Sequence, residues 1–240
     1  MVAGLGMRAL AGLLAFALAG CSGGTGSPTL YPELFSAGKA AIANKAARRA
    51  NAARPALTRA LLDTVKEPYI EVTLENHGIT GYLNRVLGRN DDGPGRIEQW
   101  RTTDAVSLSF RNGVLVATRG MGGDLVSAEV LVADGATGPV SGGERGMHLR
   151  SGDLQVVRLG LACDLEDLGA ETVTIVELSH PARHLRETCV SQGATIGGQP
   201  LAQGRVVNDY WADPHRGIMW MSRQWAGPDV GYLRIRRLIE

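Results

Sequence analysis

The stretch that decides the fold runs from residue 106 to residue 117 and reads VSLSFRNGVLVA. Its first half alternates apolar side chains (Val106, Leu108 and Phe110) with serines, which is the period of a half-buried strand. An Asn-Gly dipeptide then separates this run from a second apolar run. Asn-Gly in that setting is the strongest short-range signal of a two-residue β-hairpin. The stretch therefore predicts a pair of antiparallel strands.

The same pattern recurs on both sides of this hairpin. Short apolar runs alternate with turn residues, and the sequence holds 32 glycines. Further strands are expected at 69–74, 125–132, 154–161, 172–178, 205–211, 218–225 and 233–239, with turns at 76–78, 90–95 and 213–217. We predict a mainly β body over residues 65–240, either an antiparallel β-sandwich or a partly open barrel. The Gly-rich stretch 135–146 is the candidate internal boundary.

Residues 32–64 have a different composition, rich in alanine and in basic side chains. They predict a short helical region that Pro55 ends or kinks, with a second helix over 57–63. Two interpretations of the basic residues stay open. They contact anionic lipid headgroups, or they form the solvated face of an alanine-rich helix.

The first 21 residues have the organisation of an export signal. Arg8 is followed by an apolar run over 9–17, about the length of a signal-peptide core and roughly half of a membrane span. The run ends in LAGC at 18–21, which resembles the lipobox of bacterial lipoproteins. We expect removal of residues 1–20, lipidation of Cys21 and a tether over 21–31. Ser22 after the cysteine favours the outer membrane.

Charge and cysteine content narrow the class of protein further. Removal of the leader takes away Arg8 and leaves 24 basic against 24 acidic residues, so no global charge predicts a nucleic-acid partner. Lipidation of Cys21 leaves Cys163 and Cys189. An even remainder in an oxidising compartment favours a disulfide, worth about 3 kcal/mol for a loop of this length. Two buried free thiols are the alternative.

The sequence gives only weak signals for a catalytic or metal site. His180 and His184 have a zinc-like spacing, but Pro181 disfavours a helix there, and Cys189 is better used in a disulfide. No nucleophile elbow is present, and no pair of carboxylates is singled out. We therefore expect a binding protein without metal or cofactor rather than an enzyme. Residues 119–124 (RGMGGD) predict a glycine-shaped turn in which Arg119 pairs with Asp124.

The tryptophans near the C-terminus allow two interpretations, internal packing or contact with a sugar. In a strand, residues 220, 222 and 224 would share one face and 221, 223 and 225 the other. Trp220 and Trp225 would then point to opposite sides, which favours packing. The candidate ligand or partner surface consists of Arg119, Asp124, Trp220, Ser222, Arg223, Gln224 and Trp225.

Three stretches, 100–125, 208–213 (NDYWAD) and 220–233 (WMSRQWAGPDVGYL), resemble the YjbF family of lipoproteins, which includes the group 4 capsule lipoproteins. The resemblance implies a mostly β outer-membrane lipoprotein encoded among genes for an extracellular polysaccharide, and it supplies no catalytic residue.

We therefore expect a periplasm-facing accessory of exopolysaccharide or capsule production or secretion that acts by binding. Its candidate partners are polysaccharide export proteins or the polysaccharide itself. The alternatives are a glycan-modifying enzyme and a purely structural envelope lipoprotein.

Overall fold

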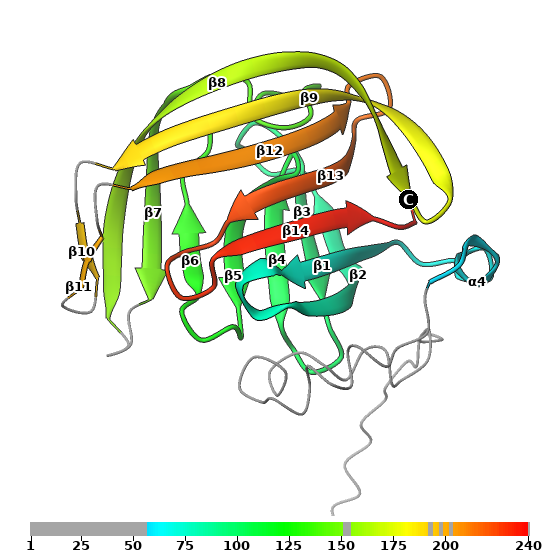
Figure 1. The fold of residues 1–240 in the computed structure, drawn as a ribbon, viewed down its shortest axis with the longest axis horizontal. Coiled ribbons are helices and arrows are strands. Elements are labelled where there is room, and N and C mark those ends of the chain that lie inside the picture. Colours follow the sequence, from blue (N-terminus) through cyan, green and yellow to red (C-terminus); the bar gives the residue numbers. More distant parts are fainter. Residues whose placement is uncertain (1–56, 151–154, 192–193, 197–198, 202–203, 240) are drawn as a thin grey trace, which may run out of the picture.

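The described residues form an antiparallel sheet of 12 strands, which curls into a nearly closed barrel, and a separate sheet of two short strands (Figure 1). The computed structural model describes residues 57–150, 155–191, 194–196, 199–201 and 204–239. In chain order the elements are α4 (Arg59–Leu62), β1 (Tyr69–Leu74), η1 (Glu75–His77), β2 (Ile79–Arg89), β3 (Ile97–Arg101), β4 (Ser107–Arg111), β5 (Val114–Arg119), β6 (Leu125–Ala128), β7 (Gly143–Arg150), β8 (Val156–Ile175), β9 (Leu178–Ser191), β10 (Ala194–Ile196), β11 (Gln199–Leu201), β12 (Arg205–Asp213), β13 (Ile218–Trp225) and β14 (Tyr232–Arg237).

The strand order shows where the barrel is not closed. The order is β5-β4-β3-β2-β1-β14-β13-β12-β9-β8-β7-β6, so the two edge strands, β5 and β6, are consecutive in sequence. They meet at a seam where the Thr118 hydroxyl accepts a hydrogen bond from the Leu125 backbone N–H at 2.9 Å. The prediction of a mainly antiparallel β body is confirmed, and the partly open barrel is the form that it takes.

The predicted hairpin at residues 106–117 is confirmed as β4 and β5. Asn112 and Gly113 form its turn with φ angles of 48° and 81°, the left-handed pair that a type I′ turn requires. A side chain at Gly113 would also collide with Met219, because an added Cβ would lie 2.8 Å from the Met219 Cβ. Local turn chemistry and the packing of β13 therefore both require glycine at this position.

The barrel interior is filled with apolar side chains. Ile70, Val72 and Leu74 alternate along β1 and pack with Trp100 and Leu108 in the main cluster. A second cluster lies on the outer face of β1 and β13. It contains Leu62 of α4, Tyr69, Trp220, and Val173 and Ile175 near the tip of the β8–β9 hairpin.

The long β8–β9 hairpin departs from the sequence-based expectation. Strands were expected at 154–161 and 172–178, but β8 runs without interruption over Val156–Ile175 and pairs with β9 along most of its length. The pairing register shifts between Asp167 and Gly169. The hairpin curls over the end of the barrel where α4 lies, as Figure 1 shows. Pairing with β9 continues β8 through the polar segment 164–171, and Val173 and Ile175 beyond it are buried in the second cluster.

The segment between β6 and β7 differs from the sequence-based expectation. β6 ends at Ala128, earlier than the expected 125–132, and residues 135–142 belong to the connection to β7, which pairs with β6 in the same sheet.

Of the expected helical region, the structure describes only the end, where α4 is capped by the Thr58 hydroxyl. The leader, Cys21 and the tether lie outside the described residues. Within the described part, no helix is long and apolar enough to span a membrane.

Cys163 and Cys189 form the predicted disulfide. They lie directly opposite each other on β8 and β9, with a Cα–Cα separation of 3.9 Å. Their sequence separation is 26 residues, so the bond closes the base of the long hairpin.

A buried polar network spans the interior of the barrel. The Glu187 Oε2 accepts hydrogen bonds from Arg145 Nη1 at 2.6 Å, Asn208 Nδ2 at 2.8 Å and the Tyr210 hydroxyl at 3.1 Å. Arg145 and Glu187 are each only 5% exposed. Burial, reinforced by the Glu187 charge, raises the pKa of Tyr210 well above its ordinary value, so its hydroxyl stays a donor.

Removal of the disulfide should destabilise the protein without changing its fold. We expect the double variant Cys163→Ser/Cys189→Ser to lose about 3 kcal/mol of unfolding free energy, because the unfolded chain regains the entropy of an open loop. Denaturant unfolding under non-reducing conditions measures the loss. A wild type that is equally stable with and without reductant would contradict this account.

Glu187→Gln should cost more, about 3 to 5 kcal/mol, because it leaves the buried Arg145 guanidinium without a counter-charge. The matched control is Glu166→Gln, an exposed residue of neighbouring strand β8, which should change stability by less than about 0.5 kcal/mol. Equal effects of the two substitutions in urea melts would show that the network is energetically unimportant.

Candidate functional site

The residues expected to form one ligand surface lie in different parts of the barrel. Trp220 is 3% exposed and packs in the outer cluster, where its ring stacks on His180 with centroids 3.7 Å apart. Trp225 is half-buried and packs against the main core. The two tryptophans therefore contribute to packing in separate clusters, the interpretation that the sequence favoured.

Ser222 and Gln224 are core residues rather than surface residues. They are 1% and 0% exposed. The Gln224 side chain accepts a hydrogen bond from Leu115 N at 2.7 Å and donates to Gly113 O and to Ser222 Oγ, both at 2.9 Å.

The strand alternation expected for 220, 222 and 224 does not hold along β13. The pairing register shifts between Trp211 and Ala212, so that Trp211 faces Met221 while Ala212 faces Met219. Trp220 is the extra residue at this bulge, which separates it from the inward-facing Ser222 and Gln224.

Arg223 lies on the outside of the barrel but is already engaged. Its Nε donates to Glu75 at 2.8 Å, and its guanidinium lies 3.6 Å from the centre of the Tyr232 ring. Both contacts hold the side chain against β14 and η1, so it has a local structural role.

The expected pairing of Arg119 with Asp124 is replaced by another arrangement. The Asp124 carboxylate accepts hydrogen bonds from Gly120 N at 3.0 Å, Met121 N at 2.9 Å and Thr118 Oγ1 at 3.3 Å. The glycine-shaped turn is therefore present, but the Asp124 carboxylate accepts hydrogen bonds from backbone amides instead of pairing with Arg119. Arg119 is exposed and lines a hollow next to the seam.

The histidines of the discarded zinc interpretation also have structural partners. His184 stacks on Trp211 with ring centroids 4.3 Å apart, and its two ring nitrogens lie 2.9 Å from Glu171 and Asp209. Cys189 lies near Glu187, but its sulfur is bonded to Cys163 and is not available as a ligand.

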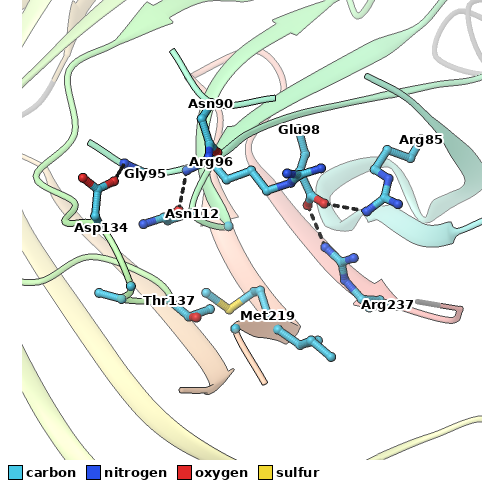
Figure 2. Close-up of a pocket in the computed structure, with 15 residues that line it drawn as sticks. Arg85, Asn90, Gly95, Arg96, Glu98, Asn112, Asp134, Thr137, Met219 and Arg237 are labelled. Carbon is cyan, nitrogen blue, oxygen red and sulfur yellow. Dashed lines mark hydrogen bonds and ion pairs between the residues drawn. The ribbon is translucent and has the colours of Figure 1, made fainter. Parts of the chain in front are cut away.

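A polar pocket of about 590 Å³ opens at the rim of the barrel (Figure 2). This rim pocket is assembled from β2, β3, the 90–96 turn, the β4–β5 turn, the 134–137 loop, the start of β13 and the end of β14. Its lining residues are Arg85, Asn90, Gly95, Arg96, Glu98, Asn112, Gly113, Asp134, Gly135, Ala136, Thr137, Gly217, Ile218, Met219 and Arg237. Its volume lies within the range of small-molecule sites.

Asn112 and Asp134 fix one wall of the rim pocket. The Asn112 side chain accepts from Arg96 N and donates to Ala133 O, both at 2.7 Å, while Asp134 accepts from Gly95 N at 2.8 Å. Figure 2 shows the Asn112–Arg96 bond, which joins the 90–96 turn to the β4–β5 turn, and the Asp134–Gly95 bond, which joins it to the 134–137 loop. Three loops remote in sequence are therefore held in a fixed arrangement.

The other wall is an ion-pair cluster around Glu98. Its carboxylate accepts hydrogen bonds from Arg85 Nη1 at 3.0 Å and from Arg237 Nη2 at 2.7 Å. Burial alone would raise the pKa of Glu98, but the two arginines outweigh it and the pKa lies below its ordinary value. Arg96 faces the same pocket, is exposed, and makes no side-chain hydrogen bond or ion pair with any described residue.

No pattern in the sequence predicts the rim pocket. Residues 90–95 and Asn112 were recognised only as turn residues, and Glu98 and Arg237 were not singled out. The one available signal was the density of Asn, Asp and Gly in these turns, which says that loops exist but not that they meet.

Comparison with known proteins identifies relatives of the chain. The family model described as group 4 capsule polysaccharide lipoprotein gfcB, YjbF matches residues 34–238. Among solved structures, the hypothetical lipoprotein YmcC from Escherichia coli K12 is similar at 19% identity and a TM-score of 0.57, over 75% of this chain and 87% of that chain. The likeness to YmcC shows a shared fold. No curated protein matches the chain.

Glu98→Gln should lower the free energy of unfolding by about 2 kcal/mol at neutral pH, because two charge-assisted hydrogen bonds are weakened. Since the pKa of Glu98 is lowered in the folded state, its contribution is present above the ordinary pKa of 4.5 and is lost as pH falls through the folded-state value. Urea unfolding of both proteins at several pH values measures the difference. Glu144→Gln, at an exposed position of β7, is the control, and a Glu98 effect that grows toward acid pH would refute the pairing.

Proposed function

The chain belongs to the YjbF family of group 4 capsule polysaccharide lipoproteins, and from this membership we propose that it is an accessory protein of capsule or exopolysaccharide production or secretion that acts by binding. A lipoprotein family is anchored to a membrane of the cell envelope. For this chain we propose the outer membrane, with the barrel facing the periplasm and Cys21 carrying the lipid.

The chemistry of lipid attachment supports a permanent anchor. Each buried methylene contributes roughly 0.8 kcal/mol, and one acyl chain alone gives only marginal binding. Two or three long chains on Cys21 would make desorption negligible. The barrel would then act at the membrane surface within reach of the tether over 21–31.

The observation that carries the binding proposal is the fixed polar lining of the rim pocket. Asn90, Arg96 and Thr137 present amide, guanidinium and hydroxyl groups to one cavity, and the bonds of Asn112 and Asp134 hold the loops that carry them. Saccharide hydroxyls are donors and acceptors that such groups can match. A preorganised wall also lowers the entropic cost of binding a flexible glycan.

Electrostatics in the pocket favours binding over glycan hydrolysis. A general acid for glycoside cleavage needs a carboxyl group whose pKa is raised. The two arginines instead lower the pKa of Glu98, and the other acidic residue of the pocket, Asp134, accepts a hydrogen bond from Gly95 N. The carboxylates of the rim pocket therefore serve to hold its walls.

We propose the polysaccharide, or the export proteins that handle it, as the partner. The balanced charge of the mature chain gives no reason to expect nucleic acid. The competing functions, an enzyme that modifies the glycan and a purely structural envelope lipoprotein, differ in their phenotypes.

The test is extracellular polysaccharide in a strain that lacks the gene and is complemented with single variants. Wild type should restore output, whereas Cys21→Ala should not, because the barrel is no longer held at the membrane. Arg96→Ala should reduce output with an unchanged melting temperature, because its side chain faces the pocket without a structural partner among the described residues.

Arg89→Ala is the matched control, an exposed arginine of β2 outside the pocket lining, and it should behave as wild type. Unchanged polysaccharide in the deletion strain would remove the functional proposal and favour the structural alternative. Polysaccharide of altered covalent structure at normal yield would favour the enzyme.

A further inference from the structure

A second hollow, of about 620 Å³, lies against the seam between β5 and β6 and is lined by three arginines. Arg101 comes from β3, Arg119 from β5 and Arg150 from the end of β7. None of the three side chains has an ion pair or hydrogen bond with any residue that the structure describes. Together with Ser107, which lies between two of them, they define the seam site.

The strand register places Arg101 and Arg119 on the same outer face. Arg101 is paired with Ser107, and Ser107 is paired in turn with Arg119, so the three residues form one row across β3, β4 and β5. Strands lie about 4.8 Å apart, so the two arginine backbones are separated by roughly 10 Å. Two long guanidinium side chains can converge over a small group bound at Ser107.

Ser107 provides a neutral donor at the centre of this row. It is only 7% exposed, and its hydroxyl has no hydrogen-bond partner among the described residues. A hydroxyl at the base of a hollow, between two arginines, is placed to donate to an anion held by them.

Arg150 adds a third positive charge from across the seam. Its backbone N–H donates to Asp124 O at 2.9 Å, which ties β7 to the turn after β5. Its Nε is buried and has no partner in the described part of the chain. A buried positive charge without a counter-charge is costly, and an anion held in the hollow that Arg150 lines would lower that cost.

Asp124 reduces the positive charge of the hollow but does not cancel it. Its two oxygens already accept hydrogen bonds from Gly120 N, Met121 N and Thr118 Oγ1. The guanidiniums therefore keep their donors free. One carboxylate against three arginines leaves a net positive site.

We propose that the seam site binds the carboxylate of an acidic sugar unit, with Arg101 and Arg119 as the two clamps and Ser107 as the central donor. The planar fork of a guanidinium matches a carboxylate in bidentate geometry. This goes beyond the proposed function, on which it rests, by adding a second site and naming the class of polysaccharide: one that contains uronic acids. Phosphate shares the same chemistry and is distinguished in the test.

The experiment measures binding of a glucuronate oligosaccharide to the full lipidated protein in detergent micelles by calorimetry. A neutral glucan of the same length and inorganic phosphate are measured in parallel. Arg101→Ala and Arg119→Ala should each weaken glucuronate binding by roughly 10- to 100-fold, the loss of one charge-assisted interaction. Arg205→Ala, at an exposed position of β12, is the control and should bind as wild type.

Arg119→Lys separates geometry from folding. The substitution keeps the positive charge and the aliphatic part of the side chain but removes the planar guanidinium. Glucuronate binding should therefore weaken while the melting temperature stays the same. Equal affinity for the neutral glucan, or equal effects of Arg119→Ala and Arg205→Ala, would overturn the proposal. Arginine-dependent binding of inorganic phosphate without binding of glucuronate would also overturn it. These results are independent of the deletion phenotype, so failure of the seam site can be told from failure of the proposed function.

Discussion

An edge strand inside a folded barrel must satisfy its backbone polar groups without a neighbouring strand, and this constraint organises the molecule. β5 ends one edge of the sheet, and the Leu115 N–H and C=O on that strand are buried. The side chain of Gln224 accepts from Leu115 N, and Arg145 Nη2 donates to Leu115 O at 3.2 Å. Side chains from β13 and β7 thus replace the missing strand, as buried backbone groups require.

This substitution explains the charged network in an otherwise apolar interior. An arginine that reaches the edge of β5 carries a positive charge into the core, and that charge must be balanced. Glu187 on β9 balances it and is itself satisfied by Asn208 and Tyr210 of β12. One unpaired edge therefore links β5, β7, β9, β12 and β13 through their side chains.

Local chemistry was readable from the sequence, and features that depend on distant packing were not. The 112–113 hairpin follows from two residues, and the disulfide follows from cysteine count and compartment. The position of Trp220 depends instead on a bulge, and Gln224 depends on an edge strand that lies over 100 residues away in sequence. Asp124 was expected to pair with Arg119 because opposite charges attract, but the tight turn brings backbone amides closer. The rim pocket joins segments from residue 85 to residue 237, which no local pattern can reveal.

The filled interior decides where such a barrel can bind anything. Small β-barrels that carry ligands often do so in their centre, but here Trp100, Leu108 and Met147 pack the core and the Glu187 network crosses it. Binding groups must therefore lie at the rim or on the outer face, where the rim pocket and the seam site are found. Both sites use arginines and lie at places where strands end or the sheet stops. Because the barrel is not closed, the edge of β5 needs the buried charges of Arg145 and Glu187. The same open seam leaves the arginines of the seam site available to a partner outside the barrel.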